Sequence, residues 1–431
     1  MHKRVAVIAA AVSVMAATSL TACSSSGSGG KNSFTYWSTW NKGEPQQKIL
    51  QAAIDSFTKD TGIKVNVQFD GRQVFKKVQT ANNTGNVPDM VDDASENLLG
   101  GANSGILRGV NDVYAQKIPG EGVPISSVIP AAAISAMKDK AGQYAMVPYE
   151  TLSTSLWFND ETMAKIGATP PATFDDLLAT CEKAVAKGIA CVADDGTIPD
   201  YNAYWITALV MRYLGPNWLR NAVADKTGQA WKDPKFLQAA QDLQRLVKGK
   251  GYMLSGYQGS KLPAGQQAWA KNKALYLLMG SWAPADTKAY AASGFKYNSV
   301  AFPSVPDGHM TQDFNSVGFA ITKKAKHPEQ AAKFIAYFLA KSQLTKISTV
   351  ADNIPSRPDI PAPAVLSSVQ KQLADAKEPS RYLDGAQGSY PDFWANVFDA
   401  ADDPLFFGTS TPQQFVDKLV SSSKSYWSSH S

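Results

Sequence analysis

Residues 57–69 read FTKDTGIKVNVQF and join the end of one regular element to the start of the next. Ahead of Gly62, apolar side chains recur at helical spacing on a single stripe, at Ile49, Leu50, Ala53, Ile54 and Phe57. Pro45 suits the first position of this helix, and Gly62 suits its end. After Gly62, apolar and polar residues alternate with period two from Ile63 to Phe69, which predicts a strand.

The same alternation of elements continues on both sides of this stretch. Residues 34–37 form a short β-like run, a second helix carries Val74, Phe75 and Val78, and a further strand begins at Asp89. Strand, helix, strand, helix, strand predicts a parallel α/β sheet. Residues 328–341 later form another amphipathic helix.

The composition bounds the class of protein. The chain has 431 residues, enough for more than one core, with 44% hydrophobic and 18% charged residues. This profile excludes a disordered, collagenous or coiled-coil protein. The net charge of +5 is not concentrated in any segment, so a nucleic-acid partner is not expected. With four histidines and three cysteines, the chain has few side chains of the kinds that commonly bind metals, and we expect no cofactor.

The first 23 residues predict export. Lys3 and Arg4 precede an apolar run of signal-peptide length, and Leu20-Thr21-Ala22-Cys23 resembles the lipobox of bacterial lipoproteins. We therefore expect a signal peptide over residues 1–22, a diacylglyceryl group on Cys23 and a flexible Ser/Gly tether over residues 23–32. The predicted location is the outer face of the bacterial cell membrane. A chance cysteine at the end of an ordinary signal peptide is the alternative.

The two remaining cysteines could pair. Cys181 lies in a predicted helix over residues 174–187, which Gly188 ends, and Cys191 lies in the strand that returns. Seven helical steps and three strand steps both cover about 10 Å, so the sulfurs could meet at one level. An exported protein can keep such a disulfide. Two unpaired buried thiols are the alternative.

The loop after the first strand is a candidate ligand site. In open α/β sheets ligands bind beyond the carboxyl ends of strands, and this loop reads Trp37-Ser38-Thr39-Trp40-Asn41-Lys42. Two indoles, hydroxyls, an amide and an ammonium stand together there. The alternative is that one tryptophan caps the core of the sheet.

An ordered series of short motifs carries a resemblance to a known family. Phe57-Thr58-Lys59-Asp60-Thr61-Gly62-Ile63-Lys64-Val65 resembles an element of the extracellular sugar-binding proteins, the family of maltose-binding protein. Further matches follow in order, at Asn86-Val87-Pro88-Asp89, Ser104-Gly105-Ile106-Leu107, residues 144–159, Met279-Gly280-Ser281-Trp282, Val317-Gly318-Phe319-Ala320-Ile321, Ile354-Pro355-Ser356-Arg357 and Phe393-Trp394. Any one motif is weak, but the ordered series spans most of residues 33–427.

The resemblance implies a two-lobed fold of the type II periplasmic-binding-protein kind. Each lobe is then a mixed sheet flanked by helices, and the ligand lies in the cleft between the lobes. We place the N-lobe at residues 33–149 and 303–352, and the C-lobe at 150–302 and 353–431. The chain is then expected to cross between lobes near Tyr149–Asn159, near Phe302-Pro303 and near Asn353–Arg357.

Sugars have C–H-rich faces that suit aromatic rings and a rim of hydroxyls that suits charged and amide groups. By position in the family pattern, the predicted stacking residues are Trp40, Tyr204, Trp205, Trp282 and Trp394, with one member of the 204–205 pair expected to face the core. The predicted hydrogen-bonding residues are Asn41, Lys42, Asp93, Glu96, Glu150 and Arg357. Each aromatic could instead be a core residue, and each carboxylate a solvated one. Asn41 and Asp93 depart from the family pattern, which argues against maltose itself.

The resemblance implies the substrate-capture lipoprotein of an ABC sugar importer, a monomer that binds a mono- or short oligosaccharide and delivers it to permease and ATPase subunits. A secreted glycosidase with two catalytic carboxylates is one alternative. A cell-surface polysaccharide-binding module is another. The sequence contains no G-x-S-x-G, H-E-x-x-H or P-loop motif, and we expect no enzyme activity.

Overall fold

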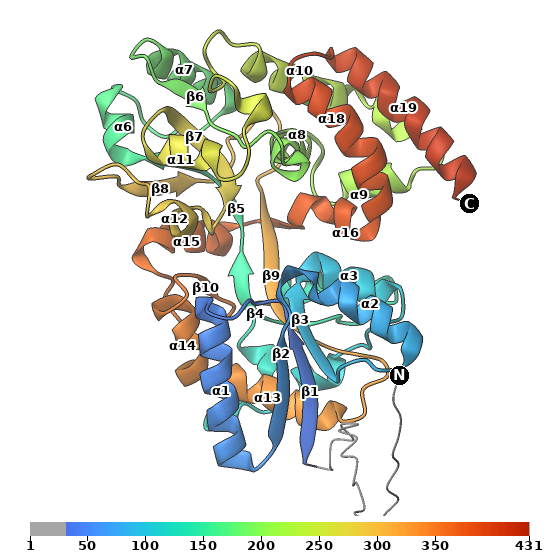
Figure 1. The fold of residues 1–431 in the computed structure, drawn as a ribbon. Coiled ribbons are helices and arrows are strands. Elements are labelled where there is room, and N and C mark those ends of the chain that lie inside the picture. Colours follow the sequence, from blue (N-terminus) through green and yellow to red (C-terminus); the bar gives the residue numbers. More distant parts are fainter. Residues whose placement is uncertain (1–31, 431) are drawn as a thin grey trace, which may run out of the picture.

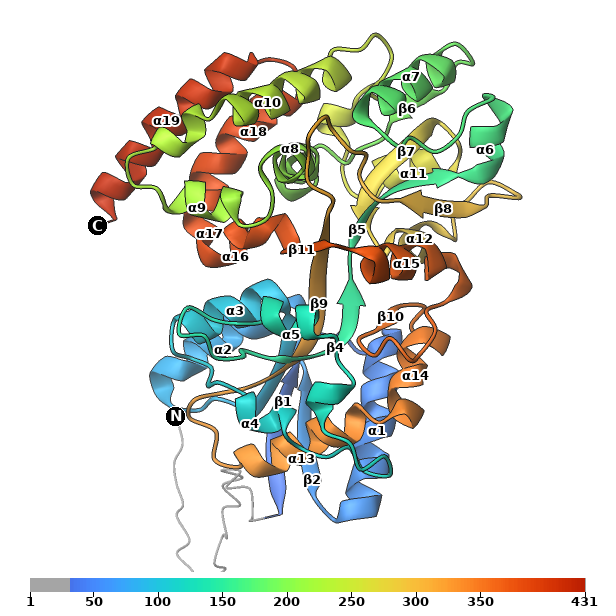
Figure 2. The same cartoon turned by 180° about the vertical axis from the view of Figure 1, so that it is seen from behind.

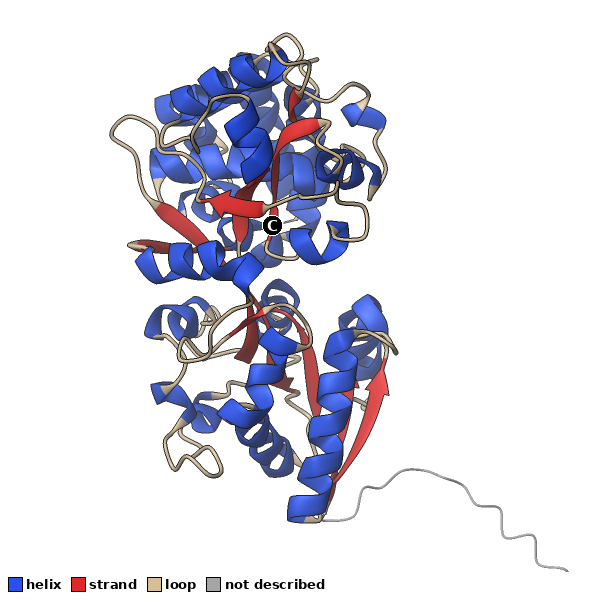
Figure 3. Cartoon of the chain, turned by 90° about the vertical axis from the view of Figure 1, so that its left-hand side faces the viewer, coloured by secondary structure: helices blue, strands red, loops and turns tan. Residues whose placement is uncertain are grey.

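The computed structural model describes residues 32–430, which fold into two lobes joined by several chain crossings (Figure 1). The predicted signal peptide, Cys23 and all of the tether except Asn32 lie outside these described residues. Each lobe has its own sheet with helices packed around it (Figure 3). The predicted two-lobed α/β fold class is therefore confirmed.

The N-lobe is built on a seven-stranded sheet. Its strands run in the order β10-β4-β9-β3-β1-β2, and β11 pairs with β9 outside this path. The bounds are β1 Ser33–Ser38, β2 Lys64–Phe69, β3 Met90–Ala94, β4 Val147–Leu152, β9 Thr311–Ile321, β10 Ile354–Pro355 and β11 Glu378–Arg381. Strands β1, β2 and β3 are parallel, as their alternation with helices predicts, whereas β9 is antiparallel to β3 and makes the sheet mixed.

Residues 57–69 and the helix before them fold as expected. Helix α1 covers Pro45–Thr61, with proline in its first turn. Gly62 ends the helix at φ +71°, a left-handed conformation that glycine adopts without strain, and its N–H donates to Thr58 O. Strand β2 follows at the edge of the sheet, and its side chains alternate between exposed and half-buried.

Helices cover both faces of the N-lobe sheet. Helices α1 and α13 (Pro328–Phe338) pack on one face, where the Phe57 and Phe334 rings lie 5.3 Å apart. Helices α2 (Val74–Thr84) and α3 (Ser95–Asn103) pack on the other. The predicted helix over residues 328–341 is two helices, because the chain breaks after Phe338 and α14 begins at Lys341. The N-lobe also contains α4 Asn111–Tyr114, α5 Ala131–Ala136 and α14 Lys341–Thr349.

The C-lobe has a four-stranded sheet and most of the helices. The strand order is β6-β7-β5-β8, with bounds β5 Thr154–Asn159, β6 Ala190–Val192, β7 Ala274–Gly280 and β8 Tyr297–Val300. Its helices are α6 Asp160–Lys165, α7 Phe174–Val185, α8 Pro199–Leu214, α9 Trp218–Ala224, α10 Pro234–Val247, α11 Ala264–Ala270, α12 Ala283–Thr287, α15 Ser367–Asp375, α16 Ala386–Ser389, α17 Pro391–Phe393, α18 Asp399–Phe406 and α19 Pro412–Ser429. Among the described residues no helix is both long and apolar enough to cross a membrane.

A disulfide joins Cys181 of α7 to Cys191 of β6, whose Cα atoms are 4.8 Å apart. Both cysteines are fully buried in the C-lobe core. The sequence left the choice between a disulfide and two thiols open, and the structure has the disulfide. It ties the helix to the neighbouring strand of the sheet.

Three chain crossings between the lobes lie within the described residues. The first crossing lies at Ser153, because β4 pairs in the N-lobe sheet as far as Leu152. The second lies along the first residues of β9, since Arg212 of the C-lobe helix α8 still donates to Thr311 O and β9 pairs with β4 only from Asn315 onward. The third lies after Ile360, which packs in the N-lobe core. Seen from behind, α15 and β11 lie where the two lobes meet (Figure 2).

Candidate functional site

Two of the cavities between the lobes are lined by indoles and carboxyl groups. The first, which we call the Trp282 cavity, has a volume of about 480 Å³ and is lined mainly by the N-lobe, with Trp282, Ala285 and Asp286 from the C-lobe. The second, the Trp394 cavity, has a volume of about 690 Å³ and is lined by α2 and α3 of the N-lobe and by Pro199, Asp200 and residues 387–399 of the C-lobe. Asn97 of the Trp394 cavity donates to Asp93 of the Trp282 cavity over 3.1 Å, so the two are neighbours.

The carboxyl ends of the parallel strands form the N-lobe wall of the Trp282 cavity. Trp40 follows β1, and its Nε1 donates to the Tyr149 hydroxyl over 2.6 Å. That hydroxyl donates in turn to Asp92 at the end of β3, again over 2.6 Å. Residues in or next to β1, β3 and β4 therefore hold the Trp40 ring in place. It lies beyond the carboxyl end of β1, which is where ligands bind in open α/β sheets.

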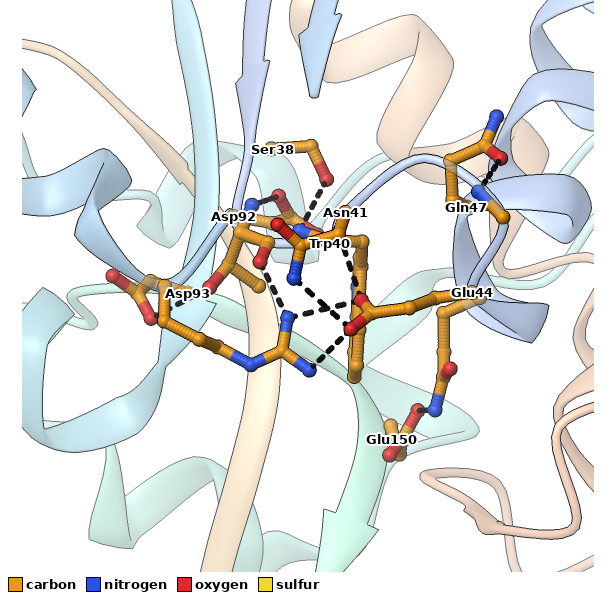
Figure 4. A network of polar contacts seen from close by, with 12 residues as sticks. Ser38, Trp40, Asn41, Glu44, Gln47, Asp92, Asp93 and Glu150 are labelled. Carbon is orange, nitrogen blue, oxygen red and sulfur yellow. Dashed lines mark hydrogen bonds and ion pairs between the residues drawn. The ribbon is translucent and has the colours of Figure 1, made fainter. Parts of the chain in front are cut away.

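The guanidinium of Arg72 also contacts the Trp40 ring. Its guanidinium lies 4.6 Å from the centre of the Trp40 ring, donates to Thr39 O over 2.6 Å, and pairs with both oxygens of Glu44 at 3.0 and 3.1 Å. Asn41 donates to Glu44 as well, from its backbone N–H and its side-chain amide (Figure 4). The loop after β1 is held in one shape by this network.

Two acids at the end of β3 are buried beneath the loop. Asp92 accepts from the backbone N–H of Thr39, and Asp93 accepts from the Thr39 hydroxyl and the Ala94 N–H. Burial raises the pKa of each carboxyl to about 6, although these hydrogen bonds favour the charged form. Asp93 lines the Trp282 cavity and presents an acceptor to it.

Glu150 of β4 is buried in the wall of the Trp282 cavity. It accepts from Asn353 Nδ2 over 2.7 Å and from Gln46 Nε2 over 3.4 Å. Burial raises its pKa to about 8, so the carboxyl is largely protonated near neutral pH and can donate as well as accept.

The C-lobe contributes an indole and a carboxylate to the Trp282 cavity. Trp282 follows β7 directly and is half-buried, and Asp286 lies one turn further on in α12. Gly280 makes room for the indole, since a Cβ at that position would lie 2.1 Å from the Trp282 ring. Burial raises the pKa of Asp286, and Arg72 across the cleft acts in the opposite direction.

The Trp394 cavity combines an indole with three carboxyl groups. Trp394 lies in a π-helical turn, its ring stacks 4.2 Å from that of Phe398, and its Nε1 donates to Asp200 over 3.2 Å. Asp399 follows on α18, and Glu96 faces them from α3. Burial raises the pKa of Glu96 to about 7, while nearby Arg381 and the Gly388 N–H lower it. The contact between Glu96 and Gly388 joins the two lobes here.

Five predicted site residues do not reach either cavity. Trp205 is 0% exposed in the C-lobe core. Tyr204 is also buried, and its hydroxyl bonds to that of Tyr382 over 2.6 Å, beside a separate cavity of only about 40 Å³. Both members of the 204–205 pair therefore face away from the cleft cavities, where one had been expected to face the ligand.

Arg357, Lys42 and Asn41 are placed differently again. Arg357 is 3% exposed and pairs with Glu121 and Asp359 in the N-lobe. Lys42 and Asn41 are exposed and line neither cavity, although Asn41 supports Glu44. The structure does bring together Trp40, Asp93, Glu150 and Trp282 in one cavity, and Glu96 and Trp394 in the other.

Sequence reasoning missed several residues at the cleft. Arg72 follows β2, so the same strand-end rule that selected Trp40 could have found it. Tyr201, in the first turn of α8, lies within electrostatic reach of Asp286 in one cavity and Asp200 in the other. It lies three residues before the predicted Tyr204, with the two ring centres 5.6 Å apart. Nothing in the local sequence distinguished Asp200 and Asp399 from solvated helix residues.

Residues 52–374 match the bacterial extracellular solute-binding proteins, which covers most of the chain. The chain belongs to this family. It is 26% identical over 311 residues to a Rhizobium meliloti protein named "Probable sugar-binding periplasmic protein", and the match covers 72% of each chain.

Solved structures of similar shape support the same fold. A binding protein of Bacillus subtilis, solved in an open conformation, has a TM-score of 0.76 at 16% identity, over 93% of this solute-binding protein and 98% of that chain. A sugar transporter protein of Bacillus licheniformis, solved in complex with stachyose, has a TM-score of 0.67 at 18% identity, over 90% and 98%. At these identities the likeness shows the two-lobed fold of the family.

Proposed function

We propose that this solute-binding protein captures a mono- or short oligosaccharide between its lobes and delivers it to the permease and ATPase subunits of an ABC importer. The observation that carries the proposal is the Trp282 cavity. There an indole from one lobe faces Asp93 and Glu150 from the other across a space of about 480 Å³. An aromatic ring for the C–H face of a sugar and fixed acceptors for its hydroxyls are what such a ligand requires.

The Trp282 cavity is lined by both lobes, which suggests how a ligand would favour lobe closure. A ligand that touches Trp282 and the N-lobe acids favours the arrangement in which both are in reach, and it shifts the lobes toward closure. The names of relatives agree with this reading, since they describe sugar-binding proteins and a stachyose complex. The closed form is then the shape that a permease would recognise.

Intrinsic tryptophan fluorescence tests the proposal. The purified protein is titrated with malto-, xylo-, cello- and raffinose-type oligosaccharides, and we expect a saturable change with at least one of them. Trp282→Ala should weaken that binding at least about tenfold, because it removes the stacking face. Trp427→Ala is the matched control, since Trp427 lies on α19 and lines neither cavity. No response to any sugar would contradict the proposal.

We propose further that the protein binds the sugar without cleaving it. A glycosidase would use two carboxyl groups of the kind found here, and its products would carry new reducing ends. Incubation of the bound oligosaccharide with the protein should leave the number of reducing ends unchanged over hours. A steady increase would instead favour the glycosidase, and selective retention on insoluble polymer would favour a polysaccharide-binding module.

The lipid anchor also stays a proposal. Cys23 and the lipobox-like segment before it support export and attachment to the outer face of the membrane. In the producing bacterium Cys23→Ser should move the protein from the membrane fraction to the soluble fraction. Equal membrane association of both forms would contradict lipidation at Cys23.

A further inference from the structure

The C-lobe wall of the Trp394 cavity contains two carboxyl groups that the proposed function does not use. Asp200 lies in the first turn of α8, and Asp399 begins α18. Both line the cavity, and Asp200 lies close enough for its charge to raise the pKa of Asp399. Asp399 is only 9% exposed, and its Oδ1 is buried and receives no hydrogen bond from the described residues.

Positive charge is scarce around this pair. Within residues 32–430, neither Asp200 nor Asp399 takes part in an ion pair. Lys140 is the only lysine or arginine that lines the cavity in this part of the chain, and its ammonium lies over the Tyr390 ring. Asp403 lies nearby and adds a third negative charge. Asp200 is half-buried and accepts from Gln387 Nε2 over 2.7 Å. Asp399 is buried without a counter-charge, which is costly, and a cationic ligand would relieve that cost.

The cavity wall around the two acids suits an organic cation better than a metal ion. Trp394 donates to Asp200 from Nε1, and it lines the same cavity. Trp394 is 1% exposed and its ring stacks on Phe398, so it holds Asp200 in the cavity wall and leaves the carboxyl groups to contact a ligand. A metal ion is a poorer fit, since no cluster of three or more His, Cys, Asp or Glu side chains among the described residues has the geometry to hold one.

We propose that the ligand contains a hexosamine unit with a free amino group, bound in the Trp394 cavity with its ammonium on Asp200 and Asp399. The inference rests on the proposed function and narrows its substrate class. An ammonium group donates three hydrogen bonds and supplies the missing charge. An N-acetylated amine has one N–H and no charge, and a hydroxyl has one O–H. A sugar acid would add a further negative charge to the same wall and is excluded by it.

Three β-1,4-linked disaccharides test this directly, because they differ only in the substituent at C2: the glucosamine dimer, its N-acetylated form and cellobiose. Each is titrated into the purified protein at neutral pH and low salt. We expect the glucosamine dimer to bind at least about tenfold more tightly than the other two, and the preference to shrink as salt is added. Equal or tighter binding of a neutral disaccharide would overturn the inference.

Two variants test whether Asp200 and Asp399 cause the preference for the glucosamine dimer. Asp399→Asn and Asp200→Asn should each reduce it to about twofold, while Asp392→Asn, an exposed change that lines neither cavity, should leave it intact. Thermal unfolding checks that each variant folds. If the Asp399 variant does not fold, the Asp200 variant still tests the inference, because Asp200 is only half-buried. If neutral sugars bind but the glucosamine dimer does not, the inference fails and the proposed function stands. If no sugar of any kind binds, the proposed function itself fails.

Discussion

The acids of the Trp282 cavity and those of the Trp394 cavity differ in their hydrogen bonding. In the Trp282 cavity, Asp93 and Glu150 each accept hydrogen bonds from neighbouring groups, and Arg72 brings a positive charge to the wall. In the Trp394 cavity, one oxygen of Asp399 and one of Glu96 are buried without a hydrogen bond from the described residues. The first cavity also contains an unpartnered buried atom, Asn353 Oδ1, but its acids are held in place before a ligand arrives. The second cavity has two carboxyl oxygens that still lack a partner among the described residues.

The tryptophans of the two cavities should differ most in their effect on stability. Trp394 is 1% exposed and packs on Phe398, so Trp394→Ala should cost about 3–5 kcal/mol in the free energy of unfolding. Trp282 is half-buried, and Trp282→Ala should cost less than about 2 kcal/mol. Urea unfolding of both variants measures this. Similar losses from the two changes would show that the indoles are equivalent core residues.

Glu150→Gln should change how stability depends on pH. Burial raises the pKa of Glu150 to about 8, above about 4.3 in the unfolded chain, so the folded protein retains a proton that the unfolded chain releases. The stability that this carboxyl contributes is fully present below about pH 4 and is lost as the pH rises through 8. Gln cannot ionise, so the free energy of unfolding of the variant should rise by about 3–5 kcal/mol relative to that of the wild type between pH 4 and 8.5.

Chemical unfolding of both proteins across that pH range measures the difference. The control is Glu329→Gln, at an exposed position in the first turn of α13. A wild type and a Glu150 variant that respond in parallel to pH would show that Glu150 is ionised in the folded protein.

The smallest of the expected effects is on sugar affinity. It distinguishes Arg72, which lines the Trp282 cavity, from the exposed Lys42. Each change to alanine removes one positive charge near the loop after β1, but only Arg72 lines the Trp282 cavity. Arg72→Ala should weaken sugar binding about tenfold, because Trp40 and Glu44 lose their shared partner. Lys42→Ala should change affinity less than about twofold. Fluorescence titration measures both, and a larger effect at Lys42 would restore its predicted role.

Local patterns predicted the fold better than the site. The stripe from Ile49 to Phe57, the glycine at 62 and the alternation that follows are all encoded within a few residues, and the structure has them at those positions. The choice between Tyr201, Tyr204 and Trp205 depends instead on how α8 lies against its neighbours. Helical spacing alone does not decide which side of α8 faces the other lobe.

The charges of the Trp394 cavity depend on still more distant contacts. Asp200 and Asp399 are separated by about two hundred positions in the chain, and both are ordinary helix residues in sequence. Only the packing of α8 against α18 brings Asp200 near enough to raise the pKa of the buried Asp399. Arg357 is the opposite case, because a motif match suggested a ligand contact where tertiary packing uses the guanidinium for ion pairs.

A crystal structure with the tightest-binding sugar tests the central claim most directly. We expect density for the sugar between the lobes, with one ring against Trp282 and hydroxyls on Asp93 and Glu150, so that both lobes contact a single ligand. A sugar bound on the outer surface of one lobe, with the Trp282 cavity unfilled, would contradict it.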